Sequence, residues 1–196
     1  YLPPVKRELP SQGHACEQVL SGHRKCTEGD LGALLYDTCP VDDVRRECRA
    51  QQKRFVDAAF LPDDAALNRE PNNAKTVEVG GGWARLGECT DAPCLYLAGA
   101  DPDDVIQGQL GNCWFVSCLA ALACAPELAE QLIYPPTFCP EGAYGVRIYY
   151  QGGWRWCLVD DYVPLDELGA PKFIRSRSGR ELWMMVLEKA FAKLHT

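Results

Sequence analysis

The chain has 196 residues, of which 47% are hydrophobic and 24% charged, and its formal net charge is −7 at pH 7. This length and composition suit one folded domain of medium size, or a domain with a small addition. The negative charge argues against a nucleic-acid-binding surface, because phosphates would be repelled, and no apolar run reaches the roughly 18–20 residues that a membrane-spanning helix needs.

The N-terminal part predicts an arm followed by two helices. Residues 1–12 contain three prolines and are expected to form an extended arm. Residues 13–50 are expected to form a helical hairpin whose helices are bracketed by cysteines. Such a hairpin would pair Cys16 with Cys48 and Cys26 with Cys39 as disulfides.

This cysteine pattern resembles, over residues 13–50, the coiled-coil-helix-coiled-coil-helix proteins with twin C-x9-C motifs. The resemblance implies oxidation in the mitochondrial intermembrane space and a role as a small structural subunit. Two alternatives stay open. One is free thiols in a reduced cytosolic protein, and the other is a zinc site made by His14, Cys16, His23 and Cys26.

The rest of the chain predicts an α+β fold. Residues 61–112 are rich in turn signals and predict a long, weakly regular but ordered segment. Residues 113–125 are apolar nearly all round and predict a central helix that is buried on every side. Residues 144–150 and 154–160 predict a β-hairpin, and Ser178-Gly-Arg-Glu181 predicts a capping box that opens a final helix. We therefore expect a helix-rich α+β domain with a small antiparallel sheet.

Cys113 has the sequence context of a nucleophile. It follows a glycine-punctuated loop, Gln107-Gly-Gln-Leu-Gly-Asn, and opens the apolar helix. A helix N-terminus presents unpaired N–H groups and positive potential, which stabilise a thiolate. Gln107 offers a side-chain N–H to a developing oxyanion. The alternative is a buried, inert cysteine.

These residues resemble the active-site segment of the calpains, a family of cysteine proteases. The resemblance extends over about residues 53–196, through motifs around the active-site segment. These are Phe55-Val-Asp-Ala-Ala-Phe-Leu-Pro62, Trp83-Ala-Arg, Gly153-Trp154, Val159-Asp-Asp-Tyr-Val-Pro164 and Leu187-Glu-Lys-Ala-Phe-Ala-Lys-Leu194.

The resemblance implies the first lobe of a papain-like, two-lobe catalytic core. In that lobe Cys113 takes the nucleophile position and Gln107 the oxyanion-donor position. The histidine and asparagine that complete the constellation come from the second lobe, and no segment here matches the histidine motif. Without a base the thiol stays mostly protonated and the leaving amine lacks a proton donor. We therefore expect the chain alone to be inactive.

The resemblance also implies a calcium site on this lobe. The matching positions are Leu97, Gly99, Asp104 and Glu188, which would supply two loop carbonyls and two carboxylates. The alternative is that Asp104 caps a turn and Glu188 pairs with a cation. No organic cofactor is expected.

Two functions follow from these observations. The first, which we favour at this point because the chain ends without the second lobe, is a non-catalytic, calpain-like interaction or structural subunit with protein partners in a larger assembly. The alternative is a calpain-type cysteine endopeptidase of which this chain is one catalytic lobe. The expected location is the mitochondrial intermembrane space if the cysteine hairpin is oxidised, and otherwise the cytoplasm.

Overall fold

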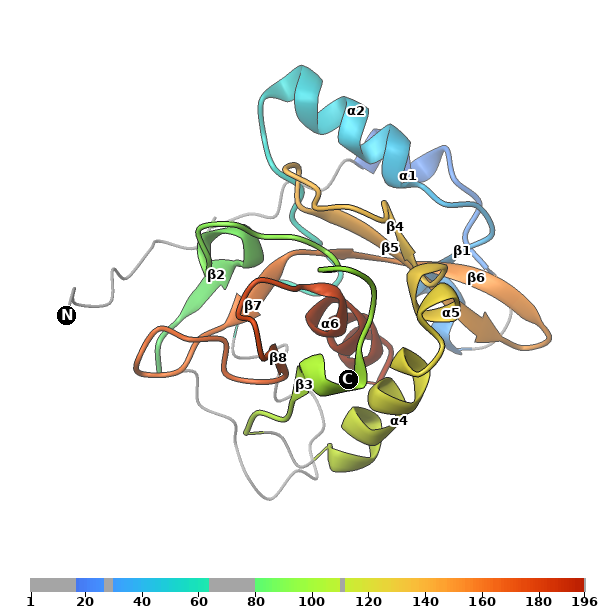
Figure 1. The fold of residues 1–196 in the computed structure, drawn as a ribbon. Helices are drawn as coiled ribbons and strands as arrows, with labels where there is room; N and C mark the ends of the chain where they lie inside the picture. Colours follow the sequence, from blue (N-terminus) through green and yellow to red (C-terminus); the bar gives the residue numbers. More distant parts are fainter. Residues whose placement is uncertain (1–16, 27–29, 64–79, 110–111, 196) are drawn as a thin grey trace.

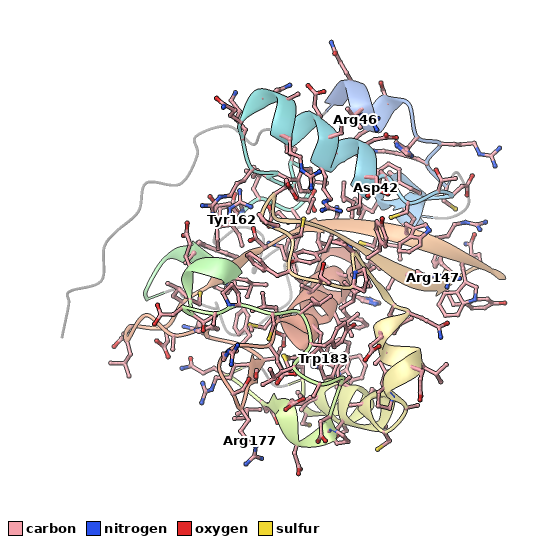
Figure 2. All side chains as sticks on the ribbon, turned by 45° about the horizontal axis from the view of Figure 1, so that its top comes forward. Asp42, Arg46, Arg147, Tyr162, Arg177 and Trp183 are labelled. Carbon is pink, nitrogen blue, oxygen red and sulfur yellow. The ribbon has the colours of Figure 1, made fainter. Side chains whose placement is uncertain are left out.

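The computed structural model describes residues 17–26, 30–63, 80–109 and 112–195. A four-stranded sheet lies between helix α2 on one face and helix α6 on the other (Figure 1). Helices α4 and α5 lie beside α6 and away from α2. Side chains follow this layering, since Trp183 of α6 is fully buried and the surface residue Arg177 points outward (Figure 2).

The main sheet is antiparallel, in the order β1-β6-β5-β4. Its strands are β1 (Leu35–Tyr36), β4 (Ile133–Tyr134), β5 (Ala143–Tyr150) and β6 (Gly153–Asp160). The predicted β-hairpin is confirmed as β5 and β6, which Tyr150 and Gly153 close around Gln151 and Gly152, both at positive φ.

The remaining strands form two small antiparallel sheets. Helices and antiparallel sheets together confirm the predicted α+β class. One pairs β2 (Trp83–Arg85) with β7 (Tyr162–Pro164), and the other pairs β3 (Val105–Ile106) with β8 (Arg175–Ser176). Short helices connect these strands: η2 (Leu86–Glu88), η3 (Pro102–Asp104) and α5 (Pro126–Glu130).

The prediction that residues 113–125 form the central buried helix is wrong. They form α4 (Cys113–Ala123), in which only Leu119 and Ala123 are buried. The central helix is α6 (Trp183–His195), with nine buried residues. Apolar composition shows that a surface is suited to burial, but α4 packs on one side only, against α5, η3 and β3 and, through the rings of Trp114 and Phe115, against Phe191 of α6. Its other face is exposed, including Trp114 with 55% of its surface accessible.

The predicted cysteine-bracketed hairpin is also not what the described residues form. They fold into α1 (Glu17–Ser21), the 3-10 helix η1 (Asp30–Leu34), strand β1 and α2 (Val41–Gln51). The chain leaves its helical path because Leu35 and Tyr36 pair with Cys157 and Trp156 on the edge of the main sheet. The structure therefore lends no support to the resemblance to twin C-x9-C proteins.

The predicted disulfide between Cys26 and Cys39 is not formed, and Cys39 is a free thiol. The two side chains pack against different hydrophobic clusters. Cys26 belongs to the larger core around α6, and Cys39 packs on the smaller core between α2 and the sheet. Cys16 and the arm at 1–12 lie outside the described residues, so the Cys16–Cys48 disulfide stays a prediction. His23, the described histidine of the proposed zinc set, contacts Thr38 and Asp43 through its ring nitrogens.

The capping box that was predicted to open the last helix does not do so. Ser178 and Glu181 are hydrogen bonded at 3.1 Å, but α6 begins later, at Trp183. The reason is that the backbone N–H groups of Leu182 and Trp183 donate to the carbonyls of Cys94 and Leu95, which hold this segment extended against the neighbouring loop.

Two buried ion pairs anchor α6, one to β6 of the main sheet and one to the segment that follows α2, and a third buried pair lies nearby. Lys193 Nζ lies 2.6 Å from Asp57 Oδ2, and Lys189 Nζ lies 2.5 Å from Asp160 Oδ1. On the adjoining strands, Arg85 pairs with Asp161 at 2.5 Å. All six side chains are at most 6% exposed. The lysines also donate to backbone carbonyls, so these charges are hydrogen bonded as well as paired.

Replacing Lys193 with Met is expected to lower the free energy of unfolding by about 3–5 kcal/mol, because it leaves the Asp57 carboxylate buried and unpaired. The double variant Lys193→Met/Asp57→Asn should recover a large part of the loss. Urea denaturation measures both. Arg46→Ala, which breaks an exposed pair with Asp43 on α2, is the control and should cost no more than about 1 kcal/mol. Equal losses for Lys193→Met and Arg46→Ala would contradict this account.

Candidate active site

Cys113 is the first residue of α4, and its side chain is exposed. Asn112 occupies the N-cap position with φ −105° and ψ 34°, and its side chain makes no capping hydrogen bond. The Asn112 carbonyl accepts from the N–H groups of Phe115 and Val116 and so starts the helix. The thiol therefore lies at the positive end of a helix that its own N-cap side chain leaves uncapped.

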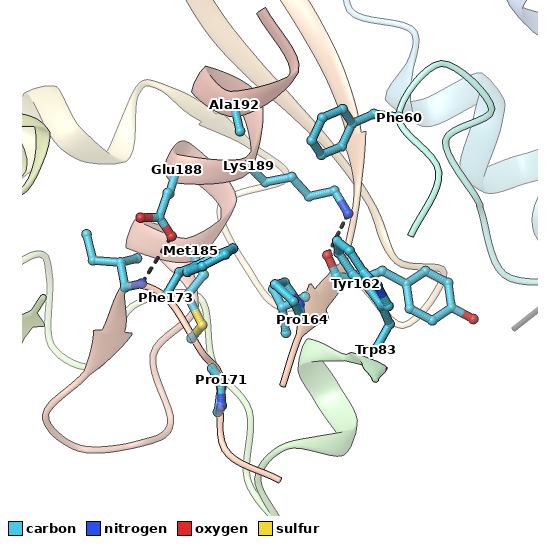
Figure 3. Close-up of a pocket in the computed structure, with 12 residues that line it drawn as sticks. Phe60, Trp83, Tyr162, Pro164, Pro171, Phe173, Met185, Glu188, Lys189 and Ala192 are labelled. Atoms are coloured by element: carbon cyan, nitrogen blue, oxygen red, sulfur yellow. Dashed lines mark hydrogen bonds between the residues drawn. The ribbon is translucent and has the colours of Figure 1, made fainter. Parts of the chain in front are cut away.

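The Asn112 side chain is instead held by Glu188 of α6. Asn112 Nδ2 donates to Glu188 Oε1 at 2.7 Å, and the backbone N–H of Ile174 donates to Glu188 Oε2 at 3.1 Å. Figure 3 shows Glu188 reaching toward this backbone while Lys189, the next residue, reaches toward the Tyr162 carbonyl. One carboxylate thus connects α6, the N-cap of α4 and the segment before β8.

The Gln107 loop packs closely on that same segment. Gln109 N–H donates to the Lys172 carbonyl at 3.2 Å. A Cβ atom at Gly108 would lie 2.1 Å from the Phe173 carbonyl oxygen, so only glycine fits there. Gln107 is exposed beside this contact. Leu110 and Gly111, which link the loop to α4, lie outside the described residues.

Burial raises the pKa of Glu188 to about 7, against an ordinary value of 4.5, and the hydrogen bonds from Asn112 and Ile174 oppose that rise. Glu188 lines an apolar cavity of about 70 Å³ together with Phe173, Ile174 and Met185. This volume is below the roughly 150 Å³ of a cavity that holds a benzene ring, so the cavity is too small for an aromatic side chain.

Neither described histidine contacts Cys113. His23 contacts Asp43 of α2, with 2.9 Å between His23 Nε2 and Asp43 Oδ2. His195 stacks on Phe191, whose ring also contacts Trp114. Among the described residues, Cys113 has no hydrogen-bonded base. The site therefore combines an accessible thiol, a helix N-terminus and a glutamine loop, which is part of the constellation for acyl transfer through a cysteine.

The structure groups the proposed calcium residues differently from the sequence. Glu181 Oε1 accepts from the Leu97 N–H at 2.9 Å. Burial raises the pKa of Glu181, and the adjacent Asp104 carboxylate raises it further. Ala98 and Gly99 adopt positive φ in the same loop. Leu97 and Asp104 thus lie with Glu181, whereas Glu188 contacts Asn112 and Ile174.

The residues around this loop form a modest donor set for calcium. Two facing carboxylates and the carbonyls of a tightly turned loop are the oxygen ligands that calcium prefers. In the part of the chain that the structure describes, no cluster of three or more His, Cys, Asp or Glu side chains is suited to a metal. A calcium ion here would therefore depend on backbone carbonyls as well as on Asp104 and Glu181.

Sequence reasoning missed Asn112 and Glu181. Asn112 carried a signal, because a strong N-capping residue directly precedes the proposed nucleophile. Glu181 was assigned to a capping box, yet it is 1% exposed. Its position directly before the apolar run Leu182–Val186 was the available sign that this carboxylate is buried.

The site thus has an exposed thiol at a helix start, preceded by a glutamine loop, and comparison with known proteins gives the family. The family model described as "Calpain family cysteine protease" matches residues 55–196. The chain belongs to this family, so the resemblance found in the sequence is confirmed.

Several calpains are similar to the chain. Calpain-type cysteine protease ADL1 of Oryza sativa subsp. japonica is 38% identical over 151 residues, which are 74% of this chain and 7% of that protein. Calpain-5 of Caenorhabditis elegans is 35% identical over 161 residues, or 79% of this chain and 24% of that protein. Calpain-12 of Mus musculus is 32% identical over 192 residues, which are 90% of this chain and 26% of that protein. The chain therefore spans about a quarter or less of the length of these relatives.

The raised pKa of Glu188 predicts a pH-dependent effect of Glu188→Gln. A folded pKa of about 7 above the ordinary 4.5 means that folding favours the protonated acid. Its stabilising contribution is complete below about pH 4.5 and is lost as the pH rises through 7. Glu188→Gln should thus stabilise the protein relative to wild type by up to about 3 kcal/mol more at pH 8 than at pH 5.

Thermal or urea denaturation at pH 5, 6, 7 and 8 measures this difference. Glu127→Gln, at an exposed glutamate of α5, is the matched control and should show no such trend. A Glu188→Gln effect that stays constant from pH 5 to pH 8 would disprove the prediction.

Proposed function

We propose that the chain is the cysteine-bearing part of a calpain-type endopeptidase catalytic core. The observation that carries this proposal is the exposed Cys113 thiol at the uncapped start of α4, tied through Asn112 to Glu188. Membership of the calpain family supports the reaction class. A structural cysteine would instead be expected inside a core, as Cys139 and Cys157 are.

In the proposed reaction the Cys113 thiolate attacks the carbonyl carbon of a peptide bond. The new C–S bond forms as the carbonyl oxygen takes up negative charge, and Gln107 would donate to this oxyanion. The tetrahedral intermediate then breaks its C–N bond, and the amine leaves with a proton from a general acid. The acyl-enzyme is finally hydrolysed by water.

The general base and acid would come from protein outside the described residues. The exposed face of α4 is the proposed contact for that protein, because it carries Trp114, Cys118 and Ala121 next to Cys113. An exposed apolar helix face of this kind is stabilised by a partner surface. Within the described residues no helix is long and apolar enough to cross a bilayer.

A peptide chloromethyl ketone should label Cys113 in preference to Cys118 and Cys124, which are exposed on or directly after the same helix. Gln107→Ala should slow this labelling about tenfold or more, because the ketone passes through an oxyanion. Reaction with iodoacetamide forms no oxyanion and should be unchanged in Gln107→Ala. Peptide mass spectrometry measures all three thiols, and equal labelling would refute the proposed role of Cys113.

The second candidate function is a non-catalytic, calpain-like interaction subunit of a larger assembly. It is favoured by the absence of a base at Cys113 among the described residues and by the open α4 face. Peptide hydrolysis by the complete gene product, lost in a Cys113→Ala variant, would rule it out. The proposed location depends on the thiols of Cys16, Cys26, Cys39 and Cys48, and is the mitochondrial intermembrane space if they are oxidised and the cytoplasm if they are reduced.

We also propose that Asp104 and Glu181, with carbonyls of the Leu97–Gly99 loop, bind calcium. The ion would neutralise two facing carboxylates and so join the loop to the start of α6. Terbium, a luminescent calcium substitute, should be sensitised by the neighbouring Trp183. Affinity on the order of 10⁻⁴ M or weaker is expected for so few carboxylates.

Asp104→Asn and Glu181→Gln should each abolish terbium luminescence and its displacement by calcium. Glu188→Gln should leave both unchanged, since Glu188 contacts Asn112 and Ile174 instead. Binding should weaken as the pH falls, because the raised pKa of Glu181 makes its carboxylate bind protons in competition with the metal. Loss of binding in Glu188→Gln with retention in Glu181→Gln would restore the set inferred from the sequence.

A further inference from the structure

We propose that Glu188 is a positioning residue for Cys113, which holds the Asn112 side chain away from the α4 N-terminus and ties it to the segment before β8. The inference rests on the proposed function, because it concerns the reactivity of the Cys113 thiol. It adds a residue on α6 to a site whose proposed reacting groups lie on α4 and the Gln107 loop.

The side chain at the N-cap of α4 is directed away from the helix. Asparagine is among the strongest N-cap residues, and its side-chain oxygen normally accepts from an amide of the first turn. Asn112 occupies this position without capping, and its side-chain nitrogen donates to Glu188 at 2.7 Å. A capping oxygen would offset the positive potential of the helix end. Glu188 therefore keeps that potential available to the thiolate at Cys113.

The Glu188 carboxylate holds both sides of the site. Its other oxygen accepts from the Ile174 N–H at 3.1 Å. The adjacent Phe173 carbonyl lies against Gly108, and Lys172 accepts from Gln109. The Gln107 loop is thus packed on a segment that Glu188 holds, while the N-cap of the nucleophile helix is held by the opposite oxygen.

The Glu188 carboxylate lies in apolar surroundings. Glu188 shares its cavity with Phe173, Ile174 and Met185, where an apolar side chain would be the more stable choice. The two donors that compensate the buried acid are the Asn112 amide and the Ile174 N–H. The adjacent ion pair of Lys189 with Asp160 fixes the rotation of α6, so Glu188 is directed at both donors. A buried carboxylate at this position costs stability, and its role in positioning Asn112 and Ile174 accounts for its presence.

The test measures iodoacetamide alkylation of the full chain under native conditions. Peptide mass spectrometry gives the rate at Cys113 relative to Cys118 and Cys124. Glu188→Met fills the same space with an apolar chain and should fold well. It frees Asn112 to cap α4, so the Cys113 rate should fall about tenfold relative to the two reference thiols.

Glu188→Gln is the conservative variant and should retain the relative rate of wild type. Its amide oxygen accepts from Ile174, and its amide nitrogen donates to Asn112 once the asparagine amide turns over. Leu187→Ala is the matched control, because it removes a buried side chain from the same turn. It should lower the melting temperature and leave the relative rate unchanged.

The outcomes separate this inference from the proposed function. Equal rates at Cys113, Cys118 and Cys124 in the wild type would overturn the proposed function, and this inference with it. A fast wild-type Cys113 that stays fast in Glu188→Met would overturn the inference alone. An equal loss in Leu187→Ala, or a loss in Glu188→Gln as large as in Glu188→Met, would also overturn it.

Discussion

The fold of this chain depends on the buried ion pairs that α6 makes with β6 of the main sheet and with the segment that follows α2. Lys193 pairs with Asp57 and Lys189 with Asp160, while Asp160 also accepts from the Asp57 N–H at 2.8 Å. Buried charges of this kind add little net stability compared with apolar packing, but each is costly to leave unpaired. They therefore restrict α6 to one rotation about its axis and one position along the sheet. An interface made of apolar contacts alone would not impose this restriction.

That constraint reaches the candidate active site through the next residue along the helix. With Lys189 fixed on one side, Glu188 is directed toward Asn112 and Ile174. The motifs that resemble the calpains are thus parts of one physical network. Arg85 pairs with Asp161, while Asp57 and Asp160 pair with the two lysines of α6. Through Glu188, α6 in turn holds Asn112, the residue before Cys113.

The face of α4 that carries Cys113 is exposed to solvent and is not covered in the way that a fully enclosed site would be. Cys113 is exposed, and Trp114 keeps more than half of its surface accessible although its ring contacts Phe191. The calpains to which the chain is similar are much longer, since it spans about a quarter or less of their length. An exposed apolar face beside a thiol that has no base among the described residues is the basis of the proposal that additional protein completes the site.

The local features of the fold could be predicted from the sequence. The β5–β6 hairpin followed from two aromatic, β-branched runs around a glycine turn, and the placement of Cys113 at a helix start followed from the glycine loop before an apolar run. These depend on neighbours along the chain, so periodicity and turn chemistry suffice. The family was also available, because its motifs are read residue by residue.

Packing between distant segments determines which helix is central, which core each cysteine joins and which loop each glutamate contacts, and these features could not be predicted. Apolar composition favoured α4 as the buried helix, yet the sheet and its lysine partners selected α6. Cysteine spacing suggested a hairpin, but the pairing of Leu35 and Tyr36 with β6 placed Cys26 and Cys39 in separate cores. Glu181 accepts from the Leu97 N–H and Glu188 contacts Asn112 and Ile174, and these partners lie far away in the sequence, so no local pattern encodes them.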